Sequence, residues 1–312
     1  MAKAAAPGRR GRQRVAARRG APGGTLAGEQ PRRTDSVVRR FARNRVVVGW
    51  GVVLGALILM AVFAPLLAPS DPLRQSAELL VPPSWPHPFG TDELGRDILS
   101  RIIYGGRISL TVGLVAVGIA AGCGTLVGLA SGFTGGALDS VIMRIIDMLM
   151  AFPGIILAIL IMSTLGPSLI NVMVAVGISA IPWYARTVRG ATLAVKESEF
   201  IFAARAVGAG PGRIMYRHIL PNVVGPVIVL GTIGIAGAIL AISGLSFLGL
   251  GAQPPSPEWG SMLSQARVYL RRAWWITTFP GLAIMLSVLA INIIGDALRD
   301  ALDPRLRGAI KD

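Results

Sequence analysis

The stretch ESEFIFAARAVGAGPGRIMYRHILPN, residues 197–222, is a polar segment in a chain that is otherwise mostly apolar. It carries two Glu, three Arg and one His, whereas residues 169–185 before it and 223–251 after it carry no charged side chain. Both of these apolar runs approach or exceed the roughly 20 residues that a membrane-spanning helix needs. The polar stretch therefore connects two membrane helices, and its own structure decides what can bind there.

The residues of this stretch predict two short helices separated by a glycine turn. Residues 196–207 contain good helix formers and no breaker. Gly208 then falls where helices commonly end on a glycine in the left-handed conformation, and Pro211 suits the first position of a second helix because its missing N–H leaves no donor unpaired. That second helix is expected to run to Leu220, since Pro221 disfavours helical geometry at the residue before it.

The first of these helices offers a place where another surface could approach closely. Ala203 and Ala204 have the smallest side chains in it. The basic residues expected around them are Arg205, Arg213 and Arg217. The spacing alone leaves two interpretations open: the segment docks on a partner protein, or it is an amphipathic helix that lies on the lipid surface.

Composition places the whole chain among polytopic membrane proteins. Of its 312 residues, 53% are hydrophobic and 15% are charged, and the mean hydropathy is +0.61. A soluble domain carries about 25% charged residues. The single cysteine, Cys123, lies in an apolar run and excludes a disulfide framework and a thiolate metal site. The two histidines, His87 and His218, are expected on opposite sides of the membrane, so no shared metal site is predicted.

Six apolar stretches are long enough to cross a bilayer. The predicted fold class is therefore all-α, a polytopic membrane protein with six transmembrane helices. The second and fifth stretches are rich in glycine, and small residues allow helix backbones to approach closely in lipid, so these two helices are expected to pack against protein. The six stretches are residues 46–68, 108–133, 141–165, 169–188, 223–251 and 276–298.

The distribution of basic residues orients these helices. With both termini in the cytoplasm, 24 of the 31 Lys and Arg fall in cytoplasmic segments, 13 of them in residues 1–45. The positive-inside rule therefore predicts cytoplasmic termini and a cytoplasmic location for residues 197–222. The basic arm, residues 1–45, is rich in Gly, Ala and Pro and is expected to be disordered. Nucleic-acid binding is one interpretation of it; fixing the topology beside anionic lipid is the stronger one.

Two segments on the opposite side, residues 70–107 and 252–275, are too long to be simple turns. In the first, a helix is expected to start at Thr91, whose hydroxyl can cap it. In the second, a proline-capped amphipathic helix is expected, with three tryptophans placed as anchors at the membrane interface. These are Trp259, Trp274 and Trp275. Membrane anchoring and docking of an external partner are equal alternatives here. The candidate docking residues are Arg267, Arg271 and Arg272.

Charged residues near the ends of the predicted spans are interpreted as structural pairs. Asp147 follows Arg144 by three residues and can pair with it on one helix face. Asp296, Arg299 and Asp300, which close the sixth stretch, receive the same interpretation. The sequence has no nucleophile with a base beside it and no GxxxxGK[ST] phosphate-binding loop, so we expect no catalytic residue and no nucleotide site in this chain.

Residues 202–222, FAARAVGAGPGRIMYRHILPN, resemble the EAA loop of the membrane subunits of bacterial ABC importers. The signature of that loop is Glu-Ala-Ala, three residues, Gly, nine residues and Ile-x-Leu-Pro. This sequence departs from it at two positions, where Phe202 replaces the Glu and His218 replaces the Ile. The positions that match are Ala203, Ala204, Gly208, Leu220 and Pro221.

Four further stretches resemble the C-type membrane subunit of the dipeptide, oligopeptide and nickel branch of this family. They are residues 87–110, 147–159, 245–263 and 279–306, and the whole resemblance covers about residues 36–308. Subunits of this branch often have an acidic residue shortly before the sequence LSFLGLG. Here residues 239–244 read ILAISG and contain none, which leaves the charge preference for the cargo open.

The resemblance implies a type I ABC importer permease fold. The loop would form a coupling helix that docks on an ATPase subunit, and ATP and Mg²⁺ would be used by such partners while this chain binds no cofactor and no metal. The residues that would make the coupling contact are Ala203, Ala204, Arg205, Gly208, Pro211, Arg213, Leu220 and Pro221.

The resemblance also implies partners and a cargo. The partners would be a second permease subunit in a heterodimer, one or two ATPase subunits, an extracytoplasmic substrate-binding protein and membrane lipid, with no nucleic acid. The cargo would be di- or oligopeptides, with nickel chelates or glutathione as alternatives, and a self-contained channel or intramembrane enzyme is the competing class. In the bacterial cytoplasmic membrane the chain would divide into an arm (1–45), a first span with an external segment (46–107), a five-span core (108–300) containing the loop (189–222), and a tail (301–312).

Overall fold

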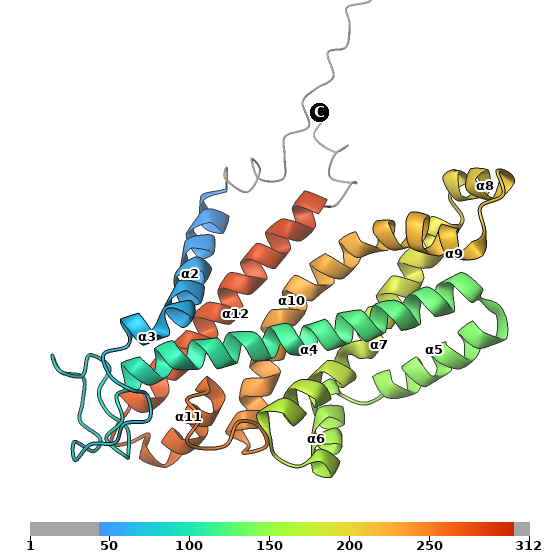
Figure 1. The fold of residues 1–312 in the computed structure, drawn as a ribbon. Coiled ribbons are helices and arrows are strands. Elements are labelled where there is room, and N and C mark those ends of the chain that lie inside the picture. Colours follow the sequence, from blue (N-terminus) through green and yellow to red (C-terminus); the bar gives the residue numbers. More distant parts are fainter. Residues whose placement is uncertain (1–43, 303–312) are drawn as a thin grey trace, which may run out of the picture. The chain divides into compact units, whose positions relative to one another are not determined.

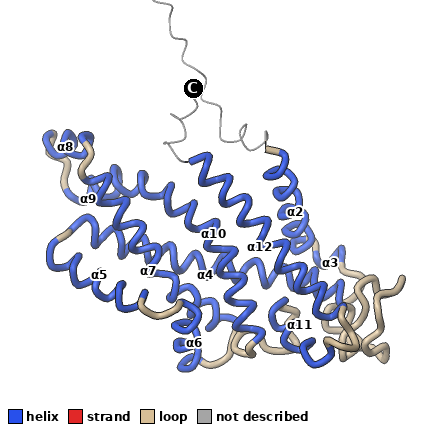
Figure 2. Tube along the Cα trace, turned by 180° about the vertical axis from the view of Figure 1, so that it is seen from behind, coloured by secondary structure: helices blue, strands red, loops and turns tan. Residues whose placement is uncertain are grey.

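The computed structural model describes residues 44–302, and every regular element in this range is a helix (Figures 1 and 2). The predicted all-α class is confirmed. All described residues belong to one compact unit. The predictions made for the basic arm before residue 44 and for the tail after residue 302 lie outside the described residues.

Five helices of the described range are long and apolar enough to cross a membrane, and they correspond to the first, second, fourth, fifth and sixth predicted stretches. They are α2 (Arg45–Val62), α4 (Ile98–Thr134), α7 (Leu169–Lys196), α10 (Leu220–Phe247) and α12 (Trp275–Leu302). Six shorter elements connect or flank them, namely α3 (Ala64–Leu67), α8 (Glu199–Ala206), α9 (Pro211–Arg213), the π-helix η1 (Ile214–Ile219), α11 (Trp259–Ala266) and the 3-10 helix η2 (Arg267–Tyr269).

The third predicted stretch is not one straight helix. It consists of α5 (Gly136–Met150) and α6 (Gly154–Leu165), which are bent by 92° relative to each other. The break falls at Pro153, whose extended backbone (φ −54°, ψ 129°) precedes α6. Proline lacks an N–H and restricts the residue before it, so α5 ends at Met150, shortly before Phe152 and Pro153. The pair is a broken span or a re-entrant element.

The elements separate toward two ends of the structure (Figure 1). The start of α2, the end of α12 and the loop with α8 and α9 lie toward one end, and α11 and the irregular segment at residues 68–97 lie toward the other. This arrangement agrees with the predicted six-span topology, in which residues 197–222 share a side with both termini. It also agrees with the prediction that residues 70–107 and 252–275 share the opposite side.

Glycines allow α4 and α7 to cross closely. A Cβ added to Gly128 would lie 2.5 Å from the carbonyl oxygen of Ala185, and one added to Gly132 would lie 2.9 Å from Cβ of Thr192. The expectation of close packing through glycines holds for these positions. It does not hold for every glycine of the two rich stretches, because Gly118, Gly122, Gly237 and Gly244 have no atom within 4 Å of such a Cβ.

The predicted helix start at Thr91 is wrong. Helix α4 begins at Ile98, and Asp97 caps it by accepting a hydrogen bond from the backbone N–H of Ser100 at 2.8 Å. The Thr91 hydroxyl instead donates to the carbonyl of Glu78 at 2.6 Å and accepts from the N–H of Val81 at 2.9 Å. Thr91 therefore ties two parts of the irregular segment together, and an aspartate six residues later has the better position to cap.

Two of the three predicted interface tryptophans lie in the protein core. Trp259 is 1% exposed and its indole N–H donates to the carbonyl of Ile102 at 3.0 Å, while the indole N–H of Trp275 donates to the carbonyl of Thr91 at 3.1 Å. Trp274 is 55% exposed and alone of the three fits an anchor. The predicted role as interface anchors is therefore wrong for two of the three. Trp259 joins α11 to α4, and Trp275 joins α12 to the irregular segment.

The predicted pairing of Arg144 with Asp147 is also wrong. Asp147 forms its ion pair with Arg186 of α7, and Asp139 accepts two hydrogen bonds from the guanidinium of Arg189 at 2.6 Å each. Both bridges join α5 to α7, because these two helices pack side by side. At the end of α12, none of the ion pairs of the described residues includes Asp296, Arg299 or Asp300.

Candidate functional site

The loop between α7 and α10 folds as a short helix closed by a glycine turn. Gly208 has φ +83°, the left-handed conformation predicted for it. Its N–H donates to the carbonyl of Arg205 at 2.9 Å, and the N–H of Ala209 donates to the carbonyl of Ala204 at 3.0 Å. These two bonds define a Schellman motif, which satisfies the last carbonyls of α8 and reverses the chain toward Pro211. Pro211 starts α9 as predicted.

A buried isoleucine fastens α8 to the ends of the long helices. Ile201 is fully buried and packs in one apolar cluster with Ile214 and Ile219 of η1. The same cluster contains Leu129 of α4, Val188 of α7 and Val223 of α10. In addition, Lys196 at the end of α7 donates to the carbonyl of Phe133 at 2.8 Å. The loop is therefore anchored by apolar contacts to the ends of three membrane helices.

The helix expected to end at Leu220 does not end there. Leu220 is helical (φ −52°, ψ −46°), and its N–H donates to the carbonyl of Met215, five residues back. The wider turn of the π-helix lets the chain continue past Pro221, which cannot donate, directly into α10. The first predicted helix is also shorter than expected: α7 runs to Lys196, and α8 begins only at Glu199.

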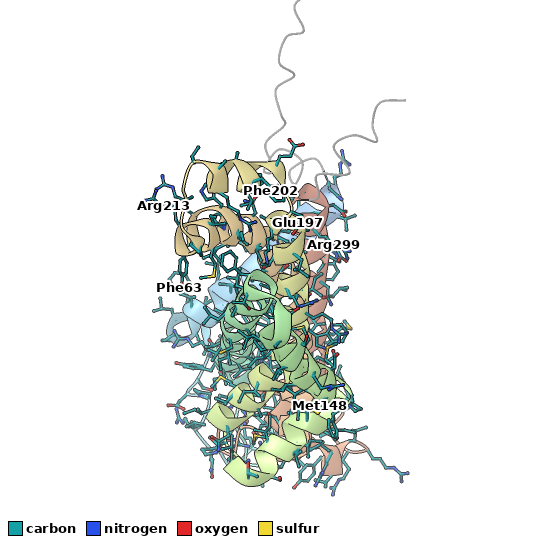
Figure 3. All side chains as sticks on the ribbon, turned by 90° about the vertical axis from the view of Figure 1, so that its right-hand side faces the viewer. Phe63, Met148, Glu197, Phe202, Arg213 and Arg299 are labelled. Atoms are coloured by element: carbon teal, nitrogen blue, oxygen red, sulfur yellow. The ribbon has the colours of Figure 1, made fainter. Side chains whose placement is uncertain are left out.

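The predicted contact residues fall into two groups. Five of them surround the glycine turn and are exposed, and these are Ala203, Arg205, Gly208, Pro211 and Arg213, while Ala204 beside them is half-buried. The other two, Leu220 (half-buried) and Pro221 (exposed), lie beyond η1 at the start of α10. Figure 3 shows Phe202 and Arg213 at the end of the structure toward which Arg299 of α12 also points, far from Met148. The predicted contact residues thus form one surface around α8 and α9, and the last two of them connect that surface to α10.

Sequence reasoning missed that this surface is apolar as well as basic. Phe200, Phe202, Val207 and Tyr216 all have exposed side chains, and Val207 is 83% exposed. The guanidinium of Arg205 lies over the ring of Phe202, 5.8 Å from its centroid. Large apolar side chains in an otherwise polar loop were the available signal. A surface with exposed aromatic side chains and arginine has the composition that is enriched in protein interfaces.

The opposite end presents a second exposed surface beside α11. Arg267, Arg271 and Arg272 are all exposed there, together with Val268, Leu270 and Trp274. In the described residues, none of these three arginines is in an ion pair. The structure thus brings the three predicted docking residues together on one segment, residues 267–274.

A buried glutamate fastens α11, which directly precedes this segment, to the membrane helix α4. Glu258 is fully buried and caps α11 by accepting from the N–H groups of Gly260 (2.9 Å) and Ser261 (2.7 Å), while Ser109 of α4 donates to it at 3.4 Å. Burial raises the pKa of Glu258, and these hydrogen bonds oppose that shift. The proline cap predicted for α11 is thus replaced by a glutamate cap that also contacts α4.

Comparison with known proteins identifies the class to which these features belong. Residues 124–308 match the family described as binding-protein-dependent transport system inner membrane component, and residues 33–83 match the N-terminal transmembrane domain of oligopeptide transport permease C. The chain belongs to the first of these families. It is therefore the membrane-spanning permease subunit of an ABC importer, a transport component of a bacterial membrane.

Two kinds of relatives are similar over most of their length. The chain is 46% identical over 276 residues to the di/tripeptide transport system permease protein DppC of Pseudomonas aeruginosa, covering 86% of this chain and 91% of that protein. It is 48% identical over 272 residues to the glutathione transport system permease protein GsiD of Escherichia coli, covering 86% and 90%. Among solved structures, the MetNI methionine ABC transporter in an inward-facing conformation has a TM-score of 0.55 at 20% identity, covering 66% of this chain and 98% of that one, which confirms the fold.

Proposed function

We propose that this permease forms half of the translocation path for short peptides and that ATPase subunits drive it by docking on α8 and α9. The relatives named for dipeptide and di/tripeptide transport support the cargo, since the chain covers about nine-tenths of their length at 44–47% identity. A second permease subunit would complete the path, and a binding protein would deliver the peptide.

One observation carries the coupling role: the exposed Ala203 and Arg205 lie on a helix that Ile201 and the Gly208 turn fix to three membrane helices. A docked partner can approach closely over the alanine, and any displacement of α8 has to move the ends of α4, α7 and α10. The chemistry would lie in the partners, which would bind ATP and Mg²⁺, while this chain would bind neither.

The orientation follows from charge. The loop with α8 and α9 lies toward the same end as the start of α2 and the end of α12 (Figure 1), and the basic residues concentrate on the segments of that end. We assign that end to the cytoplasm, where ATP is available, and the end with α11 to the outside. The permease would thus be a multi-pass protein of the cytoplasmic membrane with both termini inside.

Aspartate at Ala203 tests the docking role. The position is exposed, so the charge should leave the free chain folded, but it would be buried and unpaired once an ATPase subunit covers α8. We expect ATPase subunits to be lost from the permease on purification in mild detergent, with ATP-driven peptide uptake reduced roughly tenfold or more, as an unpaired buried charge costs well over 1.4 kcal/mol. Glu197→Ala, an exposed change outside the motif, serves as the control. Normal co-purification and uptake by the Ala203→Asp variant would refute docking at this helix.

Glutathione is the second candidate cargo, because the chain is 48% identical to a glutathione permease. Both candidates are compatible with a cavity of about 270 Å³ between α4, α6, α7 and α10, whose lining includes Ser179, Trp183, Tyr184 and Ala241 and no charged residue. Within residues 239–244, Ala241 alone lines this cavity. The test is uptake of a labelled dipeptide in the presence of excess unlabelled peptide or glutathione. Competition by peptides alone supports a peptide cargo, and competition by glutathione supports the second candidate.

Charge reversal at residues 267–274 tests docking of the binding protein. Changing Arg267, Arg271 and Arg272 together to Glu should weaken stimulation of ATPase activity by the binding protein several-fold, since exposed charges at an interface mainly govern encounter and its salt dependence. The residues are exposed and unpaired within the described range, so assembly should be unaffected. Full stimulation of an intact, assembled variant would exclude this surface.

A further inference from the structure

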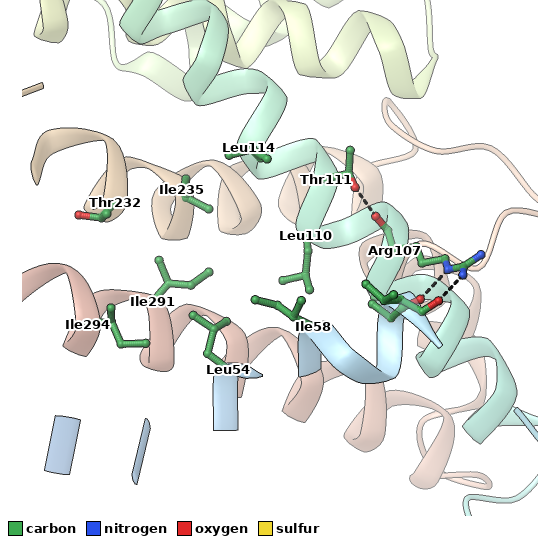
Figure 4. Close-up of a pocket in the computed structure, with 13 residues that line it drawn as sticks. Leu54, Ile58, Arg107, Leu110, Thr111, Leu114, Thr232, Ile235, Ile291 and Ile294 are labelled. Carbon is green, nitrogen blue, oxygen red and sulfur yellow. Dashed lines mark hydrogen bonds between the residues drawn. The ribbon is translucent and has the colours of Figure 1, made fainter. Parts of the chain in front are cut away.

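An apolar groove of about 590 Å³ runs between α2 and the helices α4, α10 and α12 (Figure 4). Its walls are mainly aliphatic and include Leu54, Ile58, Leu114, Ile235 and Ile291. Neither the candidate peptide cavity nor the α8–α9 surface shares any of these residues. The volume lies in the range of ligand sites, about 300–1,000 Å³. The groove therefore has room for an apolar ligand that the transport function does not account for.

One end of the groove carries a fixed positive charge. Arg107 is exposed, and its guanidinium donates to the carbonyls of Ala61 and Val62 at 2.5 Å each (Figure 4). Those carbonyls belong to the last turn of α2, where the backbone hydrogen bonds of the helix end. No carboxylate of the described residues forms an ion pair with Arg107. The side chain is held in place, but its charge is left without an anion.

The position and length of the groove match one leaflet of a bilayer. Arg107 is level with the end of α2, where the chain turns into α3 and exposes Leu66 and Leu67. The groove extends from there along α2 to Leu54, roughly 12 Å at 1.5 Å per residue. A leaflet contributes about 15 Å of hydrocarbon, half of the 30 Å core. A charge at the boundary and an apolar channel below it are complementary to a lipid headgroup and one of its acyl chains.

We propose that this groove binds a phospholipid of net negative charge, with one acyl chain between α2 and α4 and its phosphate at Arg107. The lipid would fill the space between α2 and the rest of the described helices, against which α2 buries only Val47 and Ala61. An anionic headgroup is favoured over a zwitterionic one because the guanidinium has no other counter-ion.

The test uses the full-length chain with the subunits that co-purify with it, reconstituted in bilayers that contain a photoreactive phosphatidylglycerol or phosphatidylcholine. We expect labelling at Ile58 and Leu114, with the phosphatidylglycerol probe preferred about fivefold, the factor expected for one basic residue near the headgroups. Arg107→Gln should abolish the preference, and Arg107→Lys should keep it. Excess inorganic phosphate should not compete, since the acyl chain supplies the apolar contact.

A filled groove provides the matched control. Ile58→Trp should reduce labelling several-fold, whereas Val52→Trp, on an exposed position of α2 outside the groove lining, should not. Arg74→Gln, an exposed arginine away from the groove, should leave the headgroup preference unchanged. Equal labelling by both probes in the unaltered protein, labelling displaced by inorganic phosphate, or cross-links from the groove to a co-purifying subunit would each overturn the proposal.

Discussion

Leucine in place of Gly128 is expected to leave little folded permease in the membrane. A Cβ at this position would lie 2.5 Å from the carbonyl oxygen of Ala185 and 2.8 Å from Cβ of Val188, so α4 and α7 could no longer cross where they do. A backbone oxygen and a β-branched side chain cannot rotate away as a long flexible side chain can. Overpacking of this kind typically costs 1–3 kcal/mol, and lipid supplies no hydrophobic force to draw the helices together again.

The measurement is the amount of protein in the membrane and its melting temperature in mild detergent. Gly122→Leu is the matched control, because it introduces the same side chain into the same helix at a position with no atom within 4 Å of the added Cβ. We expect Gly122→Leu to be recovered normally and Gly128→Leu to be degraded or to melt at a much lower temperature. Equal yield and melting temperature for the two variants would show that the crossing does not depend on this glycine.

The membrane helices could be predicted because each is encoded by a local property, a continuous apolar run. Five of the six predicted stretches correspond to single long helices. The third does not, because hydropathy averages over a window and does not register the backbone effect of one proline. Pro153 lies in the middle of that run and separates α5 from α6 by 92°. Pro153 itself was the signal for the break, because its effect on the backbone prevents a continuous helix although the residues around it are apolar.

Side-chain partners that come from distant parts of the chain could not be predicted from local sequence. Trp275 bonds to Thr91 and Asp147 pairs with Arg186, contacts across 184 and 39 positions in the sequence. Local rules favoured a cap at Thr91, an interfacial tryptophan and a pair with Arg144, all of which are plausible within one helix. Packing of α5 on α7 and of α12 on the irregular segment at residues 68–97 supplied these partners in place of the local ones.

The loop at residues 197–222 was the best predicted part of the site. Its turn depends on backbone preferences that single residues carry, glycine at positive φ and proline at the start of a helix. Its attachment was not predicted, since the burial of Ile201 depends on α4, α7 and η1 together. The π-helix was missed for a similar reason: the usual effect of Pro221 is to end a helix, and the wider turn before it removes that constraint.

Valine in place of Gly208 is expected to uncouple transport from ATP hydrolysis while leaving the permease in the membrane. Gly208 has φ +83° with no atom within 4 Å of an added Cβ, so the substitution introduces backbone strain and no collision. A β-branched residue is a genuine outlier at such a φ, and holding it there costs about 1–3 kcal/mol. The turn would relax, and α8 would no longer present Ala203 and Arg205 at the angle that the Ile201 anchor sets.

The measurement compares peptide uptake, binding of the ATPase subunits to the permease, and the quantity of permease in the same membranes. Uptake is expected to fall roughly tenfold for about 1.4 kcal/mol of strain. Gly208→Asn is the matched control, because asparagine tolerates the left-handed conformation and should retain most of the activity. If valine and asparagine at Gly208 reduce uptake equally, docking depends on side-chain bulk at the interface and not on the backbone conformation. If the valine variant transports normally, the glycine turn does not set the position of α8. A loss confined to valine, with the permease still present in the membrane, supports a coupling surface whose geometry depends on one residue at positive φ.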